Sequence, residues 1–244
     1  MTTATSTRSD SGALDARQFG RRVIILSPHL DDAVFSLGAT ISRMARAGVR
    51  VTIVTVFSGD PTSEIQGGPW DRLTGFRTAG EAAMARRLED QRACSLVGAN
   101  PVWGSFHDAQ YEHEWDERLA ISDLAGVLPT ADLLLLPGFP LVHPDHARIT
   151  LAVIRSGVSA SKVGLYAELP YALWSGPVRI PETLRGLVSE PLGWQGTRVG
   201  VRDVLRKMRA CSAYASQVPC FRERIVWRMT RHEVLSRHVI ALLE

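Results

Sequence analysis

Long apolar runs and clustered basic residues are both missing from this sequence of 244 residues. No stretch has the length of a transmembrane helix, and the first residues lack the apolar segment of a secretory signal. We therefore expect a cytoplasmic protein without a membrane segment. The net charge is +3, but the arginines are scattered and only two lysines occur, Lys162 and Lys207. Nucleic-acid binding favours a basic stripe, so nucleic acid is not an expected partner.

Cysteines and nucleotide-binding glycine motifs are also scarce. The three cysteines, Cys94, Cys211 and Cys220, have no CxxC spacing, which argues against a thiolate metal site and predicts free thiols. No GxGxxG motif follows the first apolar run, and no Walker loop occurs anywhere. Because those glycines let a backbone approach phosphates closely, their absence argues against a nucleotide cofactor.

Short apolar runs alternate with helical periodicity between residues 22 and 167. Strands are expected at residues 23–26, 51–57, 101–106, 133–137 and 164–167, with helices at 33–47, 78–97, around 121–128 and at 144–158. Alternation of this kind predicts an α/β fold, a Rossmann-like three-layer sandwich with a mostly parallel sheet.

The remaining segments set the expected domain organisation. Residues 1–21 are rich in Ser, Thr and Ala without periodicity and predict a disordered leader, so residues 22–244 form a single domain. Residues 170–200, rich in Pro and Gly, predict a cap of loops and short strands before a helix at 203–215. The Gly- and Pro-rich stretch at 58–75 is a candidate lid or a plain surface loop.

Two short segments concentrate the polar chemistry: Pro28–Asp32 and His143–His146. Each follows an expected strand and precedes an expected helix, so each lies at the carboxyl edge of the sheet, where α/β folds bind ligands. In the doubly wound strand order 3-2-1-4-5, the first and fourth strands are neighbours. We therefore expect the two segments to meet in space.

Three of these side chains form a plausible metal-ligand set. His29 and Asp32 are three residues apart on a turn, and His146 approaches from the opposite wall. Two imidazoles and a carboxylate suit Zn²⁺ and leave coordination positions open, as in catalytic sites. Such a site also accepts iron or cobalt.

The other polar residues of the two segments have expected catalytic roles. Zn²⁺ polarises a carbonyl and lowers the pKa of bound water to about 7, and Asp31 is placed to accept the proton of that water. His143 is a candidate donor to the oxyanion and the leaving amine, and Asp145 either orients His143 or supports a ligand. The structural alternatives are an N-cap for the Asp31–Asp32 pair and a first-turn carboxylate for Asp145.

Together the two segments resemble the paired signatures of the PIG-L/LmbE-like deacetylase family, PHPDDE and HxDH. Leu30 and Ala33 depart from the first signature, which weakens assignment to a subfamily. The resemblance implies a zinc-dependent Rossmann-like enzyme in which His29, Asp32 and His146 are ligands and Asp31 is the general base. It continues in order to about residue 217, through Arg86-x-x-Glu89-x-x-x-Ala93-x-x-x-Val97-Gly98 and through Lys207, Ala210 and Tyr214-Ala215-Ser216-Gln217.

The resemblance also implies two substrate-binding residues, Arg86 and Asp108. Arg86 could equally extend to solvent, and Asp108 could simply stabilise a turn. Four aromatic residues of the expected cap and lid, none assigned individually, are candidates to stack on a sugar ring: Trp70, Tyr171, Trp174 and Trp194.

The sequence thus predicts a zinc-dependent hydrolase that removes an N-acyl group, expected to be acetyl, from an amino sugar or glycosylated small metabolite. Two alternatives remain open at this point: an amidase of a thiol conjugate or natural-product intermediate, and a noncatalytic sugar-binding protein on the same fold. The expected partner is the small-molecule substrate, and a homo-oligomer is left open.

Overall fold

A computed structural model of the chain describes residues 13–111, 116–157, 160–189, 191–221 and 224–243. Within these ranges the strands form one seven-stranded sheet of order β3-β2-β1-β4-β5-β7-β6. β1 to β5 run parallel, and the short β7 and β6 extend the edge antiparallel. The bounds are β1 Arg22–Ser27, β2 Arg50–Thr55, β3 Ala99–Trp103, β4 Leu133–Phe139, β5 Val163–Ala167, β6 Trp194–Gln195 and β7 Ile240–Leu242.

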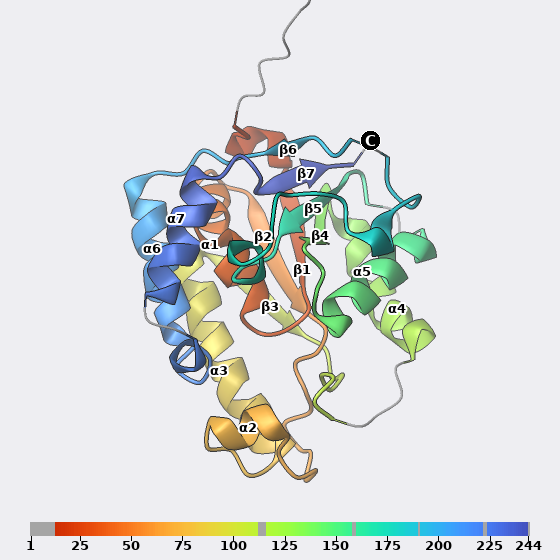
Figure 1. Cartoon of the computed structure of the whole chain (residues 1–244), viewed down its shortest axis with the longest axis vertical. Coiled ribbons are helices and arrows are strands. Elements are labelled where there is room, and N and C mark those ends of the chain that lie inside the picture. The colour runs from red at the N-terminus through yellow and green to blue at the C-terminus, as the bar shows by residue number, and fades with distance from the viewer. Residues whose placement is uncertain (1–12, 112–115, 158–159, 190, 222–223, 244) are drawn as a thin grey trace, which may run out of the picture.

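Helices cover both faces of this sheet (Figure 1). One face is packed by α1 Asp32–Arg46, α3 Ala79–Val97, α6 Val201–Ala213 and α7 Ile225–Leu235, and the other by α4 Glu117–Ala125 and α5 Pro144–Ser156. The short α2, Pro69–Leu73, lies beyond the sheet edge. The expected three-layer α/β sandwich is therefore confirmed. No helix in the described ranges has the length and apolarity needed to cross a membrane.

The central strand β4 is buried along its whole length and packs closely against β5. All seven residues of β4 are buried, because it lies between β1 and β5 with helices on both faces. Gly138 lies where the register between β4 and β5 shifts, and a Cβ at this position would come within 2.4 Å of the Leu165 Cβ. A side chain at 138 would therefore push β4 and β5 apart just before the segment that carries His143.

Two expectations about secondary-structure elements need correction. β3 begins at Ala99 rather than 101, because Gly98 adopts a left-handed conformation (φ +83°) that ends α3 and feeds the strand directly. Residues 170–200 contain the 3-10 helices Tyr171–Leu173 and Glu182–Leu184, and their strand β6 joins the main sheet through β7.

The expected disordered leader is wrong for its second half. Residues 1–12 lie outside the described ranges, but Ala16–Phe19 form a 3-10 helix. Leu14 and Phe19 are 2% and 3% exposed, and the Leu14 N–H donates to the Gly196 carbonyl. This turn could not be predicted from the sequence, because two apolar side chains in a short polar stretch show no helical periodicity.

Candidate metal centre and substrate pocket

The two polar segments meet at the carboxyl edge of the sheet, as expected. His29 follows β1, Asp32 begins α1, and His146 lies in the first turn of α5. Adjacent parallel pairing of β1 with β4 brings these turns together. His29 Nδ1 is 3.2 Å from Asp32 Oδ2 and 3.2 Å from His146 Nε2, and the third side of this triangle, Asp32 Oδ2 to His146 Nε2, is 3.1 Å.

Local hydrogen bonds fix the turn that presents His29 and Asp32. The Ser27 hydroxyl donates to the His29 carbonyl and accepts the Ala33 N–H. The His29 N–H donates to Asp32 Oδ2 at 2.9 Å. Because the turn closes on itself, both side chains are held on the same side of the chain.

The dimensions of the triangle fit one tetrahedrally coordinated ion. At metal–ligand distances of about 2.0 Å, two ligand atoms of a tetrahedron are ~3.3 Å apart. All three observed separations lie close to this value. The donor atoms of His29, His143 and His146 also lie within 4.8 Å of one another, but this set is looser. We therefore take His29, Asp32 and His146 as the residues that fit a metal ion.

Two buried carboxylates support the histidines from behind. Asp145 Oδ2 lies 3.2 Å from His29 Nε2, whereas it is 3.9 Å from His143 Nδ1. Of the two roles considered for Asp145, the geometry thus favours support of His29. Glu168, at the end of β5, makes a short contact with His146 Nδ1 and accepts the Leu141 N–H at 2.8 Å. Carboxylates in these positions fix the ring orientation of metal-binding histidines and raise their basicity.

The charges around the triangle favour a cation. Burial alone would lower the pKa of His146, but the Asp32 and Glu168 carboxylates raise it to about 9. Burial opposes ionisation of Asp32, yet His146 and His29 hold its pKa well below the usual range. Ionised carboxylates therefore surround two imidazoles in a water-poor site, and a bound cation compensates this negative charge.

The Asp31 side chain does not cap α1, which argues against the alternative that this residue serves only as an N-cap. It stands at the N-cap of α1, but its side chain makes no capping hydrogen bond and lines the pocket instead. Burial and the neighbouring Asp32 raise the pKa of Asp31 to about 7. A carboxyl group with a pKa in this range can both accept and return a proton near neutral pH.

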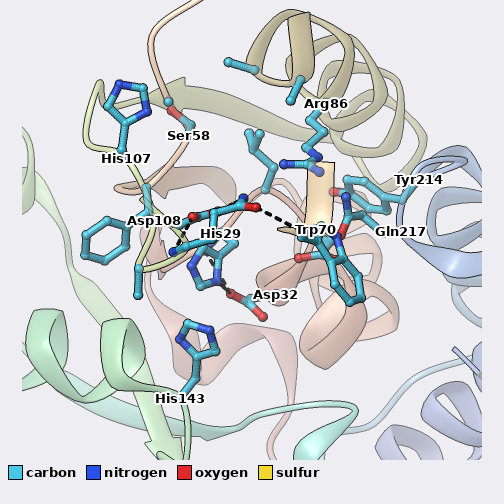
Figure 2. A pocket seen from close by; sticks show the side chains of 18 of the residues that line it. His29, Asp32, Ser58, Trp70, Arg86, His107, Asp108, His143, Tyr214 and Gln217 are labelled. Carbon is cyan, nitrogen blue, oxygen red and sulfur yellow. Dashed lines mark hydrogen bonds and ion pairs between the residues drawn. The ribbon is translucent and has the colours of Figure 1, made fainter. Parts of the chain in front are cut away.

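His143 lines the pocket on the side of His29 that faces away from Arg86 (Figure 2). Its Nδ1 accepts the Asp145 N–H at 3.3 Å, and this contact assigns the ring proton to Nε2. Burial and the nearby His29 and His146 lower the pKa of His143 to about 4, so its neutral imidazole is favoured. The neutral ring still offers the one N–H donor that the expected role of His143 requires.

Both expected substrate residues, Arg86 and Asp108, line the pocket. Arg86 Nη1 forms a 2.8 Å ion pair with Asp71 Oδ1, so this arginine does not extend freely to solvent. Asp108 stabilises a turn, because its two oxygens accept the Gln110 N–H and side-chain amide. Asp108 therefore both stabilises a turn and lines the pocket.

The pocket has a volume of about 420 Å³ and predominantly apolar walls. This size suits a small ligand, since such sites commonly measure roughly 300–1,000 Å³. Trp70 and Tyr171 line it, whereas Trp174 is 54% exposed and Trp194 lies in β6. Trp70 belongs to the candidate lid at 58–75, and its indole N–H donates to Gln217 Oε1 across the pocket rim.

Several residues of the metal centre and the pocket were not predicted from the sequence. Glu168 carried a weak signal, a single acid at the end of a buried strand. His107 also lines the pocket. Phe221 lines the wall beside Trp70, with ring centroids 6.4 Å apart, but nothing in its sequence context indicates this position.

Comparisons with known proteins agree with this geometry. The chain is 26% identical to a 1D-myo-inositol 2-acetamido-2-deoxy-alpha-D-glucopyranoside deacetylase of Rhodococcus erythropolis, over 81% of each chain. It is 29% identical to a 2'-N-acetylparomamine deacetylase of Streptomyces fradiae, over 83% of this chain and 76% of the relative. The crystal structure of a deacetylase of the A40926 pseudoaglycone superposes with a TM-score of 0.72 at 26% identity, over 91% and 96% of the chains.

A protein-family model also matches the chain. The model described as PIG-L, GlcNAc-PI de-N-acetylase, matches residues 24–156, which is more than half of the chain. The matched range contains both polar segments and ends with α5. The chain therefore belongs to the PIG-L family of de-N-acetylases.

Proposed function

We propose that this chain is a zinc-dependent N-deacetylase acting on an amino sugar or a glycosylated small metabolite. The triangle of His29, Asp32 and His146, with sides of 3.1–3.2 Å, carries the proposal. It matches one face of a tetrahedral site and leaves the side toward the pocket open for water and substrate. Two imidazoles and one carboxylate suit Zn²⁺, which supports zinc over the other metals that such sites accept.

A bound zinc ion would supply two effects, a lower pKa of water and polarisation of the amide carbonyl. Asp31 accepts the proton of the attacking water, since its carboxylate faces the pocket and is free of a capping hydrogen bond. Returned to the departing amine, that proton overcomes the poor leaving-group character of an amide nitrogen. His143, with its proton on Nε2, donates to the developing oxyanion.

Support for an amino-sugar substrate comes from the pocket and from the relatives. Aromatic rings such as Trp70 and Tyr171 suit the apolar faces of a sugar, and Asp108 offers an acceptor for its hydroxyl groups. The relatives named above are deacetylases of acetylated amino-sugar compounds. A single catalytic domain over residues 22–244 and a cytoplasmic location are parts of this proposal.

The first experiment measures metal content and acetate release together. Wild-type protein should carry about one zinc per chain and release acetate from N-acetylglucosaminides. His29→Ala should lose both, whereas Asp31→Asn should keep the metal and lose turnover by a factor of ~10²–10⁴. His238→Ala, an exposed histidine near the C-terminus, is the matched control and should change neither property.

The outcomes separate the alternatives. Metal-free protein after zinc is resupplied would refute the hydrolase proposal. Metal with no turnover of acetyl, longer acyl or thiol-conjugate amides, but with sugar binding, would indicate a noncatalytic sugar-binding protein. Turnover confined to another acyl amide would keep the mechanism and change the substrate.

A further inference from the structure

The pocket contains a single lysine or arginine among its described lining residues, Arg86. Its guanidinium does not carry a free charge into the cavity. Arg86 Nη1 lies 2.8 Å from Asp71 Oδ1, and its Cζ lies 5.5 Å from the centre of the Phe76 ring. The Asp71 side chain is fully buried, so water screens the attraction between the two groups only weakly.

Asp71 is held in place by more than this ion pair. Its carboxylate accepts the Tyr111 hydroxyl and the Gly68 N–H, and Gln110 Nε2 approaches at 3.4 Å. These contacts join α2 to α3 and to the turn after β3. The pairing of Arg86 is therefore part of the packing of the pocket rim, and an incoming anion would have to displace a buried carboxylate to reach it.

Asp108 has the opposite arrangement, because a cation is absent from its described hydrogen bonds and ion pairs. Both oxygens accept from neutral Gln110 groups, which leaves lone pairs and a full negative charge toward the pocket. The adjacent Ala109 N–H donates to Asp145 Oδ2 at 2.8 Å, and the same oxygen contacts His29. Asp108 is thus fixed close to the metal ligands, as Figure 2 shows.

The overall balance of the pocket is consequently negative. A divalent ion would offset the charges of Asp31 and Asp32, while Asp71 offsets that of Arg86. Asp108 then remains as the uncompensated charge of the described lining. The aromatic walls act in the same direction, since ring faces attract cations and repel anions.

We propose that this pocket selects amino-sugar substrates by charge: it favours those with a cationic group near the acetamide and disfavours anionic ones. The inference rests on the proposed deacetylase function and deepens it. The Asp108 carboxylate attracts the ammonium group of such a substrate. Because Arg86 is paired with Asp71, its guanidinium does not bind the phosphate or carboxylate of an anionic substrate.

Three glycosides of N-acetylglucosamine with aglycones of similar size and different charge test the proposal: 2-hydroxyethyl (neutral), 2-aminoethyl (cationic) and carboxymethyl (anionic). At low salt, kcat/KM for the cationic glycoside should exceed that for the anionic one by about tenfold, equal to ~1.4 kcal/mol. Added salt should reduce this ratio, because it screens the Asp108 charge. An anionic glycoside hydrolysed as fast as the cationic one would overturn the proposal.

Two variants locate the origin of the selectivity, each normalised to its own rate on the neutral glycoside. Asp108→Asn should bring the cationic and neutral rates together. Asp71→Asn should release the Arg86 charge and raise the relative rate on the anionic glycoside by about tenfold. Should Asp71→Asn not fold, the wild-type ratio and Asp108→Asn still decide the matter, and an unchanged cationic preference in Asp108→Asn contradicts the assignment.

Failure of the underlying function can be recognised separately. Absence of turnover on all three glycosides by the metal-loaded wild type would refute the deacetylase proposal on these substrates. Binding of the three glycosides to metal-loaded Asp31→Asn, followed by ligand-observed NMR, then tests the charge preference without catalysis. Equal or stronger binding of the anionic glycoside there would overturn the inference.

Discussion

Replacing Glu168 by glutamine would keep the shape of the side chain behind His146 and remove its charge. Glu168 is 1% exposed, His146 is fully buried, and the carboxylate serves two donors, His146 Nδ1 and the Leu141 N–H. Glutamine has one acceptor oxygen, so its amide group must face one of these donors. The variant therefore loses both the charge and one hydrogen bond.

We expect this loss to weaken zinc binding. Removing a carboxylate that supports a metal-binding histidine typically costs ~10–100-fold in affinity, or about 1.4–2.7 kcal/mol. Since both partners are buried, little solvent screening reduces their interaction, and the upper part of that range is expected for Glu168→Gln. The pKa of His146 should also fall from its raised value, because the Glu168 contact contributes to the increase.

Competition with a chromophoric chelator measures the zinc affinity directly, independent of turnover. Glu182→Gln is the matched control, because the Glu182 side chain is 89% exposed and contacts only Arg185 among its described ion pairs. Thermal unfolding of the metal-free proteins checks that Glu168→Gln still folds. An affinity within about twofold of wild type in a folded variant would refute the supporting role.

Three further predictions concern stability, each read by chemical denaturation of the metal-free protein. Burial raises the pKa of Asp90 to about 6, so the stabilising contribution of this side chain is present at low pH and is lost as pH rises through about 6. The difference in unfolding free energy between wild type and Asp90→Asn should therefore fall by about 1.4 kcal/mol from about pH 5 to about pH 8. A pH-independent difference would contradict this prediction. Lys207→Met should lower the unfolding free energy by ~3–5 kcal/mol, because it leaves the buried Glu233 carboxylate without its ion-pair partner. The double variant with Glu233→Gln should recover part of this loss, whereas additive effects of the two substitutions would argue against coupling. Phe19→Ala should cost about 3–5 kcal/mol, and no change would mean that the ordered segment before β1 contributes nothing.

The parts of the fold that the sequence predicted well are those whose periodicity reflects burial. β4 is buried along its whole length and reads as a continuous apolar run, and α1 shows one apolar face. β7 was not predicted, and β6 was expected only as an unplaced short strand of the cap, because strands of three and two residues are too short to show alternation. Their place in the sheet depends on tertiary pairing, because β7 pairs with β5 and β6 pairs with β7.

The residues of the site likewise include some that the sequence predicted and some that it did not. His29, Asp32 and His146 were predictable because short spacings place them in turns at one sheet edge. Glu168 was not, since its contact with His146 depends on the lateral packing of β4 and β5 and not on local spacing. The pairing of Arg86 with Asp71 was equally hidden, because α2 lies in a segment without periodicity.

Helix α1 connects the metal centre to the end of the chain. Its Ala39 and Thr40 N–H groups donate to Glu233 of α7, and its Phe35 carbonyl accepts from Lys207 of α6. The family match ends at residue 156, before both partners. The matched portion therefore lacks part of the main core: a fragment ending there would leave out nine of the 28 buried residues described in that core, including Tyr166 and Met229. The C-terminal helices α6 and α7 thus hold α1, and with it Asp32, against the sheet, although they lie far from the metal ligands in the sequence.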